Sequence, residues 1–274
     1  MTRVVATLAA VLLLLVSPSL SRASEPQSVK IDGGSYMARL PAGWDGKAPL
    51  ATVVYFHGYR QKGATVMRNK GLLKILDKRQ ILLISPDGEG GRWAHQGSPR
   101  RATLRDDDAF VRRVLADVRG RWPVDPKRLW ASGFSIGGSM TWHVACFIGK
   151  PFTAFIPVAG AFWRPHPLDC PAGPANILHT HGTADTVVPM KGRPIAGTYH
   201  QGDVREGMAF WRHQNGCAAK PTRVTSVGTL TCKISDQCAS GGELQLCLHG
   251  GQHGIPKGWA NPALDWAERV SAGK

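Results

Sequence analysis

Short apolar runs alternate along this chain with longer segments in which apolar positions recur at helical spacing. The runs predict strands near residues 29–40, 51–57, 81–86, 128–134, 154–159, 176–181 and 243–249. The periodic segments predict helices near 65–78, 105–119, 136–148 and 203–215. Because strands that alternate with helices favour βαβ units, the pattern predicts an α/β fold with a mostly parallel central sheet and helices on both faces.

The predicted helix near residue 105 begins with three consecutive acidic residues, Asp106, Asp107 and Asp108. Negative charge in a first turn suits the helix dipole, and Arg112 and Arg113 follow it. Three adjacent carboxylates also raise the alternative of a cation site. The favoured interpretation is a solvated helix start.

The first 23 residues have the composition of a targeting segment. Arg3 supplies the positive charge, residues 4–16 are apolar, and small residues at 21 and 23 suit cleavage before Ser24. We therefore predict a signal peptide over 1–23 and a secreted or periplasmic protein. The apolar part is too short to span a bilayer and no later segment reaches 18 apolar residues, so no membrane span is expected.

The remaining residues, 24–274, are expected to form one domain. The full chain has 274 residues, of which 43% are hydrophobic, and no internal repeat or interior linker is visible. Its net charge is +15, and removal of Arg3 and Arg22 with the signal peptide lowers this to +13. The basic residues are spread without an arginine-rich arm, so no nucleic acid partner is expected. Attraction to an anionic polysaccharide is the alternative to an ordinary basic exported protein.

The segment Gly133-Phe-Ser135-Ile-Gly137 lies between a predicted strand and a predicted helix. In a nucleophile elbow, small residues let the chain reverse sharply and leave the serine hydroxyl exposed at the head of the helix. The strand–turn–helix setting makes this motif more specific than a bare Gly-x-Ser-x-Gly. We therefore predict Ser135 as a catalytic nucleophile, against the alternative of a turn without chemistry.

An acid and a histidine are expected downstream of that serine, in this order. Asp185 lies in the loop after the predicted strand at 176–181, at the edge where an open parallel sheet carries its functional groups. His253 lies in a glycine-flanked segment after the apolar run 244–248. We predict Asp185 as the orienting acid, against a turn cap, and His253 as the general base. The competing histidines are His249, His179, His181 and His57.

The apolar run 51–56 ends in His57-Gly58-Tyr59, well before the nucleophile. In this topology such a loop supplies one backbone N–H to the developing oxyanion, and the residue after the serine supplies the other. We predict the N–H groups of Tyr59 and Ile136 as these donors, and a structural role for His57 in bracing the loop. Trp93, Trp163 and Trp259 follow predicted strands or catalytic loops and are candidate substrate-binding residues, with burial in the core as the alternative.

All six cysteines lie in the second half of the chain, at 146, 170, 217, 232, 238 and 247. An even number in an exported chain favours three disulfides, for which 15 pairings are possible. We favour Cys146–Cys170, which would join the helix after the nucleophile to the loop after the next strand. A zinc site is disfavoured because no Cys-x-x-Cys pair exists, and neither a metal nor a cofactor is expected.

Several segments resemble the secreted polyhydroxybutyrate depolymerase and feruloyl esterase group of the α/β-hydrolases, over about residues 28–260. They are Val124-Asp-Pro-Lys-Arg128, Gly133-Phe-Ser-Ile-Gly-Gly-Ser-Met140, Pro157-Val-Ala-Gly160, His181-Gly-Thr-Ala-Asp185-Thr-Val-Val-Pro189, Phe210-Trp211, Asn215-Gly-Cys217 and Gly250-Gly-Gln-His253. The resemblance implies the α/β-hydrolase fold and a Ser-His-Asp triad. The group's cysteine spacing also implies Cys217–Cys238, which leaves Cys232–Cys247 across neighbouring strands.

The chain departs from the group at three places beside the predicted site. The usual Gly-Gly-Gly-His is Gly-Gly-Gln252-His253 here, and the usual Trp-Pro after it is Ile255-Pro256. Tyr59 stands where relatives often have cysteine. None of these changes removes a catalytic group, but they put a direct transfer of substrate in doubt.

The predicted function is that of an exported serine esterase. Its substrates would be hydroxyalkanoate oligomers or polyesters, or feruloyl and acetyl esters of plant polysaccharide. Without a visible polymer-binding module, soluble or partly soluble esters are favoured. A general carboxylesterase, phospholipase or peptidase on the same scaffold is the alternative, and the chain shows no added propeller or gating domain of the kind that would favour a peptidase. A non-catalytic binding protein is disfavoured because Ser135, Asp185 and His253 occur in the expected order.

Overall fold

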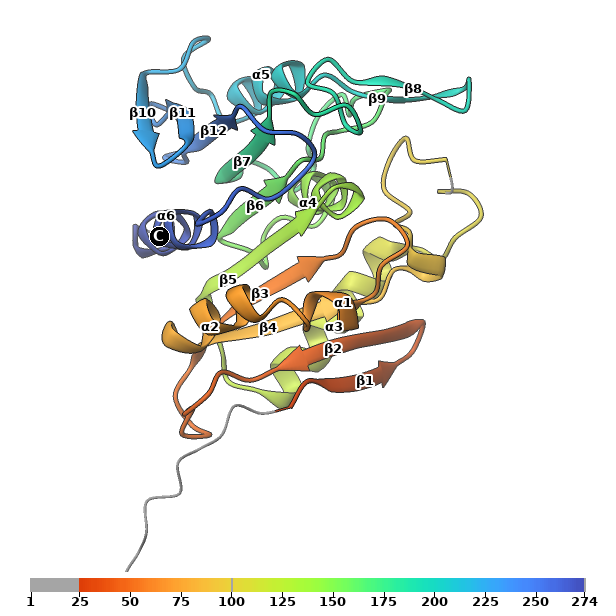
Figure 1. The fold of residues 1–274 in the computed structure, drawn as a ribbon, viewed down its shortest axis with the longest axis vertical. Coiled ribbons are helices and arrows are strands. Elements are labelled where there is room, and N and C mark those ends of the chain that lie inside the picture. Colours follow the sequence, from red (N-terminus) through yellow and green to blue (C-terminus); the bar gives the residue numbers. More distant parts are fainter. Residues whose placement is uncertain (1–24, 100, 274) are drawn as a thin grey trace, which may run out of the picture.

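The fold is built on a ten-stranded sheet in a computed structural model that describes residues 25–99 and 101–273. The predicted signal peptide lies outside the described residues. Figure 1 shows the sheet running from β1 and β2 at one edge to β10 and β11 at the other. In spatial order the strands are β1 (Gln27–Ile31), β2 (Gly34–Arg39), β4 (Ile81–Pro86), β3 (Leu50–Phe56), β5 (Val124–Phe134), β6 (Ala154–Val158), β7 (Ile177–Gly182), β12 (Leu244–His249), β11 (Leu230–Ser235) and β10 (Arg223–Val227).

The central strands, from β4 across to β12, run parallel, and the pairs at both edges are antiparallel. Every residue of β3 and β4 is buried. A strand covered on both faces is apolar throughout rather than alternating, which explains their continuous apolar runs. The prediction of a mostly parallel central sheet is confirmed.

Helices cover both faces of this sheet, as predicted (Figure 1). One apolar cluster contains side chains of α3, α4 and α5, and a second contains those of α2 and α6. The helices are α1 (Gly63–Val66), α2 (Lys70–Lys78), α3 (Asp107–Arg121), α4 (Ile136–Phe147), α5 (Val204–Gln214) and α6 (Ala260–Ala272). A 3-10 turn over Glu89–Gly91 and a small hairpin of β8 (Arg193–Ile195) and β9 (Tyr199–Gln201) complete the elements. No helix in the described part of the chain is long and apolar enough to cross a membrane.

Two predicted elements are divided in the structure. The single strand expected at 29–40 is a hairpin, because the chain turns at Asp32 and Gly33, where Gly33 has a φ of 82°. The helix expected at 65–78 is interrupted before α2, whose start is capped by the Asn69 side chain accepting from the Leu72 N–H. The hairpin β8–β9, the edge strands β10 and β11, and helix α6 were not predicted.

The start of α3 is solvated only in part, and this corrects the sequence interpretation: Asp106 is exposed, Asp108 is half-buried and Asp107 is buried. Asp106 caps the helix by accepting from the Ala109 N–H. Asp107 is buried and accepts from the Ala94 N–H at 2.7 Å, and Arg105 pairs with it. Asp108 accepts from His143 Nε2 at 2.7 Å. These carboxylates therefore anchor the segment before α3 to the body of the protein.

All three predicted disulfides are present. Cys146–Cys170 joins the end of α4 to the segment before β7. Cys232–Cys247 connects directly paired residues of β11 and β12, as expected for neighbouring strands. Cys217–Cys238 ties the end of α5 to the segment between β11 and β12. No cysteine in the described residues is free.

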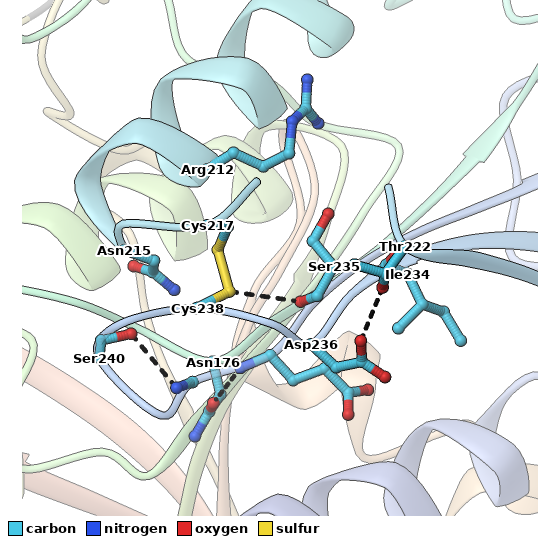
Figure 2. The surroundings of a disulfide bond; sticks show 12 residues. Asn176, Arg212, Asn215, Cys217, Thr222, Ile234, Ser235, Asp236, Cys238 and Ser240 are labelled. Atoms are coloured by element: carbon cyan, nitrogen blue, oxygen red, sulfur yellow. Dashed lines mark hydrogen bonds between the residues drawn. A yellow bond between two sulfur atoms is a disulfide. The ribbon is translucent and has the colours of Figure 1, made fainter. Parts of the chain in front are cut away.

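Figure 2 shows how polar side chains order the chain around Cys217–Cys238. Asn215 lies beside the bridge and forms two hydrogen bonds with the backbone of Ala175, donating at 2.8 Å and accepting at 3.1 Å. Asn176 accepts from the Glu243 N–H at 2.8 Å (Figure 2). The bridge and the two amides therefore hold the starts of β7 and β12 together, and both strands lead into loops that carry predicted site residues.

We predict that replacing Cys232 and Cys247 together by alanine lowers the free energy of unfolding by about 2–4 kcal/mol. The bridge closes a 15-residue segment, so its loss gives the unfolded chain more conformations. Urea unfolding of the parent and the double variant measures the difference. Thr231→Ala, an exposed change on the same strand, is the control. An unchanged free energy in the double variant would contradict the prediction.

Candidate active site

Ser135 occupies a sharp turn between β5 and α4. Its φ of 60° and ψ of −123° are rare for a residue with a side chain, as expected for a strained elbow. A Cβ on Gly133 would lie 2.3 Å from the Gly137 carbonyl oxygen, and one on Gly137 would lie 2.0 Å from that of Phe56. Only glycine therefore allows the strand, the turn and the helix to approach this closely.

Two loops bring their predicted side chains to this turn. His253, after β12, lies with Nε2 2.9 Å from Ser135 Oγ. Its Nδ1–H donates to Asp185 Oδ2 at 2.7 Å, and Asp185 lies in the loop after β7. The Phe134 ring packs against the imidazole with a centroid distance of 4.8 Å. The structure thus brings together the three residues predicted as nucleophile, base and acid, whereas His249 lies outside this hydrogen-bonded path.

Asp185 is buried and its carboxylate is fully engaged. Oδ1 accepts from the backbone N–H groups of Val187 and Val188, each at 2.8 Å, while Oδ2 receives His253. Burial raises the pKa of Asp185, but the hydrogen bonds from His253 and Val188 outweigh it and the pKa lies below its ordinary value. Asp185 is therefore an anion that fixes which His253 nitrogen carries the proton.

A buried chain of hydrogen bonds supports the acid loop from behind. Trp142 Nε1–H, on α4, donates to His179 Nδ1 at 3.2 Å, and His179 Nε2–H donates to His181 Nδ1 at 2.9 Å. His181 Nε2–H then donates to the Val188 carbonyl at 2.7 Å and lies 3.5 Å from Asp185 Oδ2. The chain therefore links the helix behind Ser135 to the loop that holds Asp185.

The two histidines in this series of hydrogen bonds, His179 and His181, are neutral. Burial is the largest influence and lowers the pKa of both His179 and His181 below the ordinary histidine value. Each neutral ring carries one proton, so one of its nitrogens donates and the other accepts. All hydrogen bonds of the series therefore point the same way, from Trp142 toward the Val188 carbonyl. The sequence identified neither histidine as part of a support for Asp185, because the path begins at Trp142 on α4, which is distant in sequence.

The predicted oxyanion loop is braced as expected. His57 Nδ1–H donates to the Gly58 carbonyl at 2.9 Å, and Nε2 accepts from the Gly88 N–H at 2.9 Å. Burial, its largest influence, lowers the pKa of His57. Within the described residues, the N–H groups of Tyr59 and Ile136 have no hydrogen-bond acceptor. Both predicted donors are therefore open to a ligand.

The three candidate tryptophans lie in different settings. Trp93 is 2% exposed, packs on Phe56 and His57, and donates from Nε1 to the His57 carbonyl at 3.0 Å, so it braces the loop instead of offering an aromatic wall. Trp163 is 6% exposed and packs near His95. Trp259 is 7% exposed but lines a cavity next to the site.

That cavity has a volume of about 500 Å³ and is mainly apolar. Its wall includes Phe134 before the nucleophile, Gln61 of the oxyanion loop, and Ile255 after the histidine. The remaining lining residues are Tyr55, Thr65, Val66, Asn69, Gly71, Leu72, Ile75, Pro256, Lys257, Gly258, Trp259 and Ala260. The end of β5 and two of the loops around Ser135 therefore border a space for part of a ligand.

Sequence comparison relates the chain to curated esterases, although no family model matches it. It is 26% identical over 231 residues to feruloyl esterase B of Piromyces equi, covering 79% of this chain but only 42% of that protein. It is 25% identical over 241 residues to the probable feruloyl esterase C of Aspergillus terreus, covering 85% of this chain and 81% of that protein. The chain thus spans less than half of the first relative and most of the second.

Structural comparison gives the same fold. An acetyl xylan esterase from Aspergillus awamori superposes with a TM-score of 0.66, at 12% identity, covering 89% of this chain and 99% of the other. At this identity the likeness concerns the fold alone. Together with the sheet order and the elbow, it confirms the predicted α/β-hydrolase fold.

We predict that His181→Phe lowers both stability and turnover. The change removes an acceptor for His179 and a donor to Val188, and each unsatisfied buried group costs about 1–3 kcal/mol. Because the Val188 backbone also holds Asp185, kcat should fall more than KM rises. Urea unfolding and steady-state ester hydrolysis measure the two effects, with His213→Gln on the exposed face of α5 as the control. Unchanged turnover in a folded variant would exclude support of Asp185 through this chain.

We also predict that stability falls as the pH drops below about 6.5, the ordinary histidine pKa. Burial lowers the pKa of His57, His179 and His181, and that of His95 to about 3. Below pH 6.5 these histidines bind protons in the unfolded chain but stay neutral in the folded protein. The free energy of unfolding therefore falls as the pH drops, by up to about 1.4 kcal/mol per pH unit for each histidine.

Urea unfolding at pH 7.5, 6.0 and 5.0 checks this dependence. His95→Asn should reduce the slope of the unfolding free energy against pH by the amount that corresponds to about one bound proton, even if the variant is less stable at every pH. The control His213→Gln should keep the slope of the parent. A parent whose free energy of unfolding is the same at pH 7.5 and 5.0 would contradict the prediction.

Proposed function

We propose that this chain, an α/β-hydrolase of the feruloyl esterase group, is a serine carboxylic-ester hydrolase that acts on esters of plant polysaccharide. The observation that carries the proposal is the hydrogen-bonded path from Ser135 through His253 to Asp185 at the head of α4. The names of the relatives support the substrate class, since they refer to feruloyl and acetyl xylan esters.

In the proposed first step, Ser135 attacks the ester carbonyl carbon while His253 Nε2 takes the hydroxyl proton. The carbonyl oxygen becomes an oxyanion and accepts from the N–H groups of Tyr59 and Ile136. Asp185 stabilises the imidazolium that forms. When the carbon–oxygen bond to the alcohol breaks, His253 returns the proton to the leaving oxygen, and an acyl-enzyme remains on Ser135.

In the second step the same groups work on water. His253 removes a proton from a water molecule, whose oxygen attacks the acyl carbon, and the same two N–H groups hold the oxyanion. Collapse of this intermediate breaks the bond to Ser135 Oγ, which regains its proton from His253. The carboxylic acid is released, and the cycle needs neither a metal nor a cofactor.

The cavity beside the site is the proposed place for the apolar part of the ester. Phe134, Ile255 and Trp259 give it apolar walls, and Ile255 remains 40% exposed at its rim. Ile255 is also one of the positions where the chain departs from the resembling group. The substrate within the class is therefore expected to differ from that of the group's members with tryptophan here. Hydroxybutyrate oligomers stay as a second substrate prediction from the sequence resemblance.

Export is part of the same proposal. Three disulfides are typical of proteins that fold in an oxidising compartment. Cleavage of a signal peptide over residues 1–23, leaving one catalytic domain over 24–274, remains a prediction. Amino-terminal sequencing of the exported protein tests the cleavage site before Ser24.

We predict that Ser135→Ala lowers ester hydrolysis by about 10⁴-fold or more while the protein stays folded, because no other group can form the acyl-enzyme. The assay panel is p-nitrophenyl acetate, methyl ferulate, acetylated xylan and hydroxybutyrate oligomers. A fluorophosphonate probe should label the parent at Ser135 only, and Ser28→Ala, an exposed change on β1, is the control.

The panel also separates the proposal from its alternatives. A folded parent that hydrolyses none of these esters and takes no label would indicate a binding protein or a different hydrolase. Labelling at another serine, or substantial activity in Ser135→Ala, would contradict the assigned nucleophile.

A further inference from the structure

Two arginines enclose the side chain of Tyr59 on the loop that carries a proposed oxyanion donor. The guanidinium carbons of Arg60 and Arg92 each lie 5.2 Å from the centre of the Tyr59 ring. Arg92 Nη2 also donates to the Tyr59 hydroxyl at 3.1 Å. Tyr59 is nevertheless 48% exposed, so this cluster, the Tyr59 clamp, is open to solvent.

The backbone holds the two arginines in this position. Arg60 has a φ of 57°, a left-handed conformation that is uncommon for a residue with a side chain. Its N–H donates to the Gly91 carbonyl at 2.9 Å. A Cβ on Gly91 would lie 2.8 Å from Arg60 Cα, so the two loops are in direct backbone contact. The clamp is therefore formed by a tight junction of two segments that are about thirty residues apart.

No carboxylate in the described residues pairs with Arg60 or Arg92. The two acids nearest in sequence to Arg92 already have other partners. Asp87 accepts from the Gly63 N–H at 2.7 Å and from the Ser35 hydroxyl at 2.8 Å. Glu89 accepts from the Arg105 N–H at 2.6 Å. Most guanidinium donors of the clamp are thus free for an external anion.

The position of the clamp connects it with the proposed reaction. Tyr59 follows Gly58 directly, and its own N–H is a proposed oxyanion donor. Two residues later, Gln61 lines the cavity beside Ser135 and accepts from the Gly58 N–H at 3.1 Å. A group bound to the Tyr59 side chain would therefore be held by the same residue whose N–H is a proposed donor to the ester carbonyl oxygen.

We propose that the Tyr59 clamp is a subsite for a carboxylate of the substrate, so that the enzyme prefers esters on acidic, uronic acid-bearing polysaccharide. The inference rests on the proposed function. A guanidinium matches the planar carboxylate with paired donors, and two of them beside one aromatic ring provide more donors than a neutral sugar needs. The Tyr59 hydroxyl accepts from Arg92 and keeps its own proton to donate. The net charge of +13 expected after removal of the predicted signal peptide, which carries Arg3 and Arg22, favours approach of such a polymer.

A matched pair of substrates tests the preference. Methyl glucuronoside and methyl glucoside, each acetylated on the same ring hydroxyl, differ only at C6, which is a carboxylate in the first and a hydroxymethyl group in the second. The parent should hydrolyse the acidic ester with about three- to tenfold higher kcat/KM, mainly through a lower KM, and the ratio should shrink as salt is added. A monoester of a dicarboxylic acid, assayed with its neutral counterpart, distinguishes a carboxylate on the acyl side. Competition by inorganic phosphate distinguishes a general anion site.

Arg60→Gln and Arg92→Gln should each reduce the ratio of acidic to neutral kcat/KM toward one. Arg119→Gln removes the same charge from an exposed arginine of α3 that also has no ion pair in the described residues, so it should keep the parent's ratio. Equal kcat/KM for the acidic and neutral esters in the parent would overturn the proposal. A preference for the acidic ester that survives both clamp variants would also overturn it.

A binding measurement separates failure of the subsite from failure of the proposed function. Calorimetry with the Ser135→Ala protein compares a uronic acid-bearing xylo-oligosaccharide with its neutral counterpart, without any turnover. Tighter binding of the acidic sugar that is lost in Ser135→Ala/Arg92→Gln supports the clamp, even if no ester in the panel is cleaved. Equal binding of both sugars overturns it, even if neutral esters are good substrates.

Discussion

The close backbone contact around Ser135 is the constraint on which the rest of the structure depends. The carbonyls of Phe56 and Gly137 lie within about 2.0–2.3 Å of where a Cβ would stand on Gly137 and Gly133. The main chains of β3, β5 and α4 therefore meet without intervening side chains. This contact gives Ser135 its unusual φ and presents its hydroxyl at the edge of the sheet. The strain is maintained because the surrounding buried strands leave the turn no other conformation.

The acid side of the site is stabilised differently, by a buried polar chain instead of close packing. Each buried polar group in it has a partner, from Trp142 to the Val188 carbonyl, so the desolvation penalty is offset by hydrogen bonds. Because His179 and His181 are neutral, this series of hydrogen bonds places no second charge beside Asp185. Asp185 therefore accepts from the backbone N–H groups of Val187 and Val188 on one oxygen and from His253 on the other.

The local motifs could be predicted from sequence because their geometry is set by near neighbours. Gly133, Ser135 and Gly137 define the elbow within five residues, and the buried parallel strands appear as continuous apolar runs. The pairing Cys146–Cys170 also followed from the predicted elements around it, whereas Cys217–Cys238 and Cys232–Cys247 rested on the family resemblance.

Features that depend on distant contacts were not predictable in the same way. Asp107 and Asp108 resemble a solvated helix start in sequence, and only their contacts with Ala94 and His143 show that they are anchors, the first buried and the second half-buried. Strand β10 is mostly exposed at an edge, so it lacks the apolar alternation that identifies a half-buried strand. Trp93 follows a predicted strand, but its burial against His57 is decided by the packing of two loops.

Positions in the site differ in whether their side chains can be changed. A side chain at Gly133 or Gly137 would collide with backbone, so change there would destroy the elbow itself. Tyr59 and Ile255, in contrast, are 48% and 40% exposed, and both are positions where the chain departs from the group it resembles. Their side chains can change without moving the backbone N–H of Tyr59 or the imidazole of His253. The proposed selection of a substrate therefore uses partly exposed side chains such as Tyr59 and Ile255, whereas the proposed acyl-transfer chemistry uses the turn at Ser135 and the buried carboxylate of Asp185.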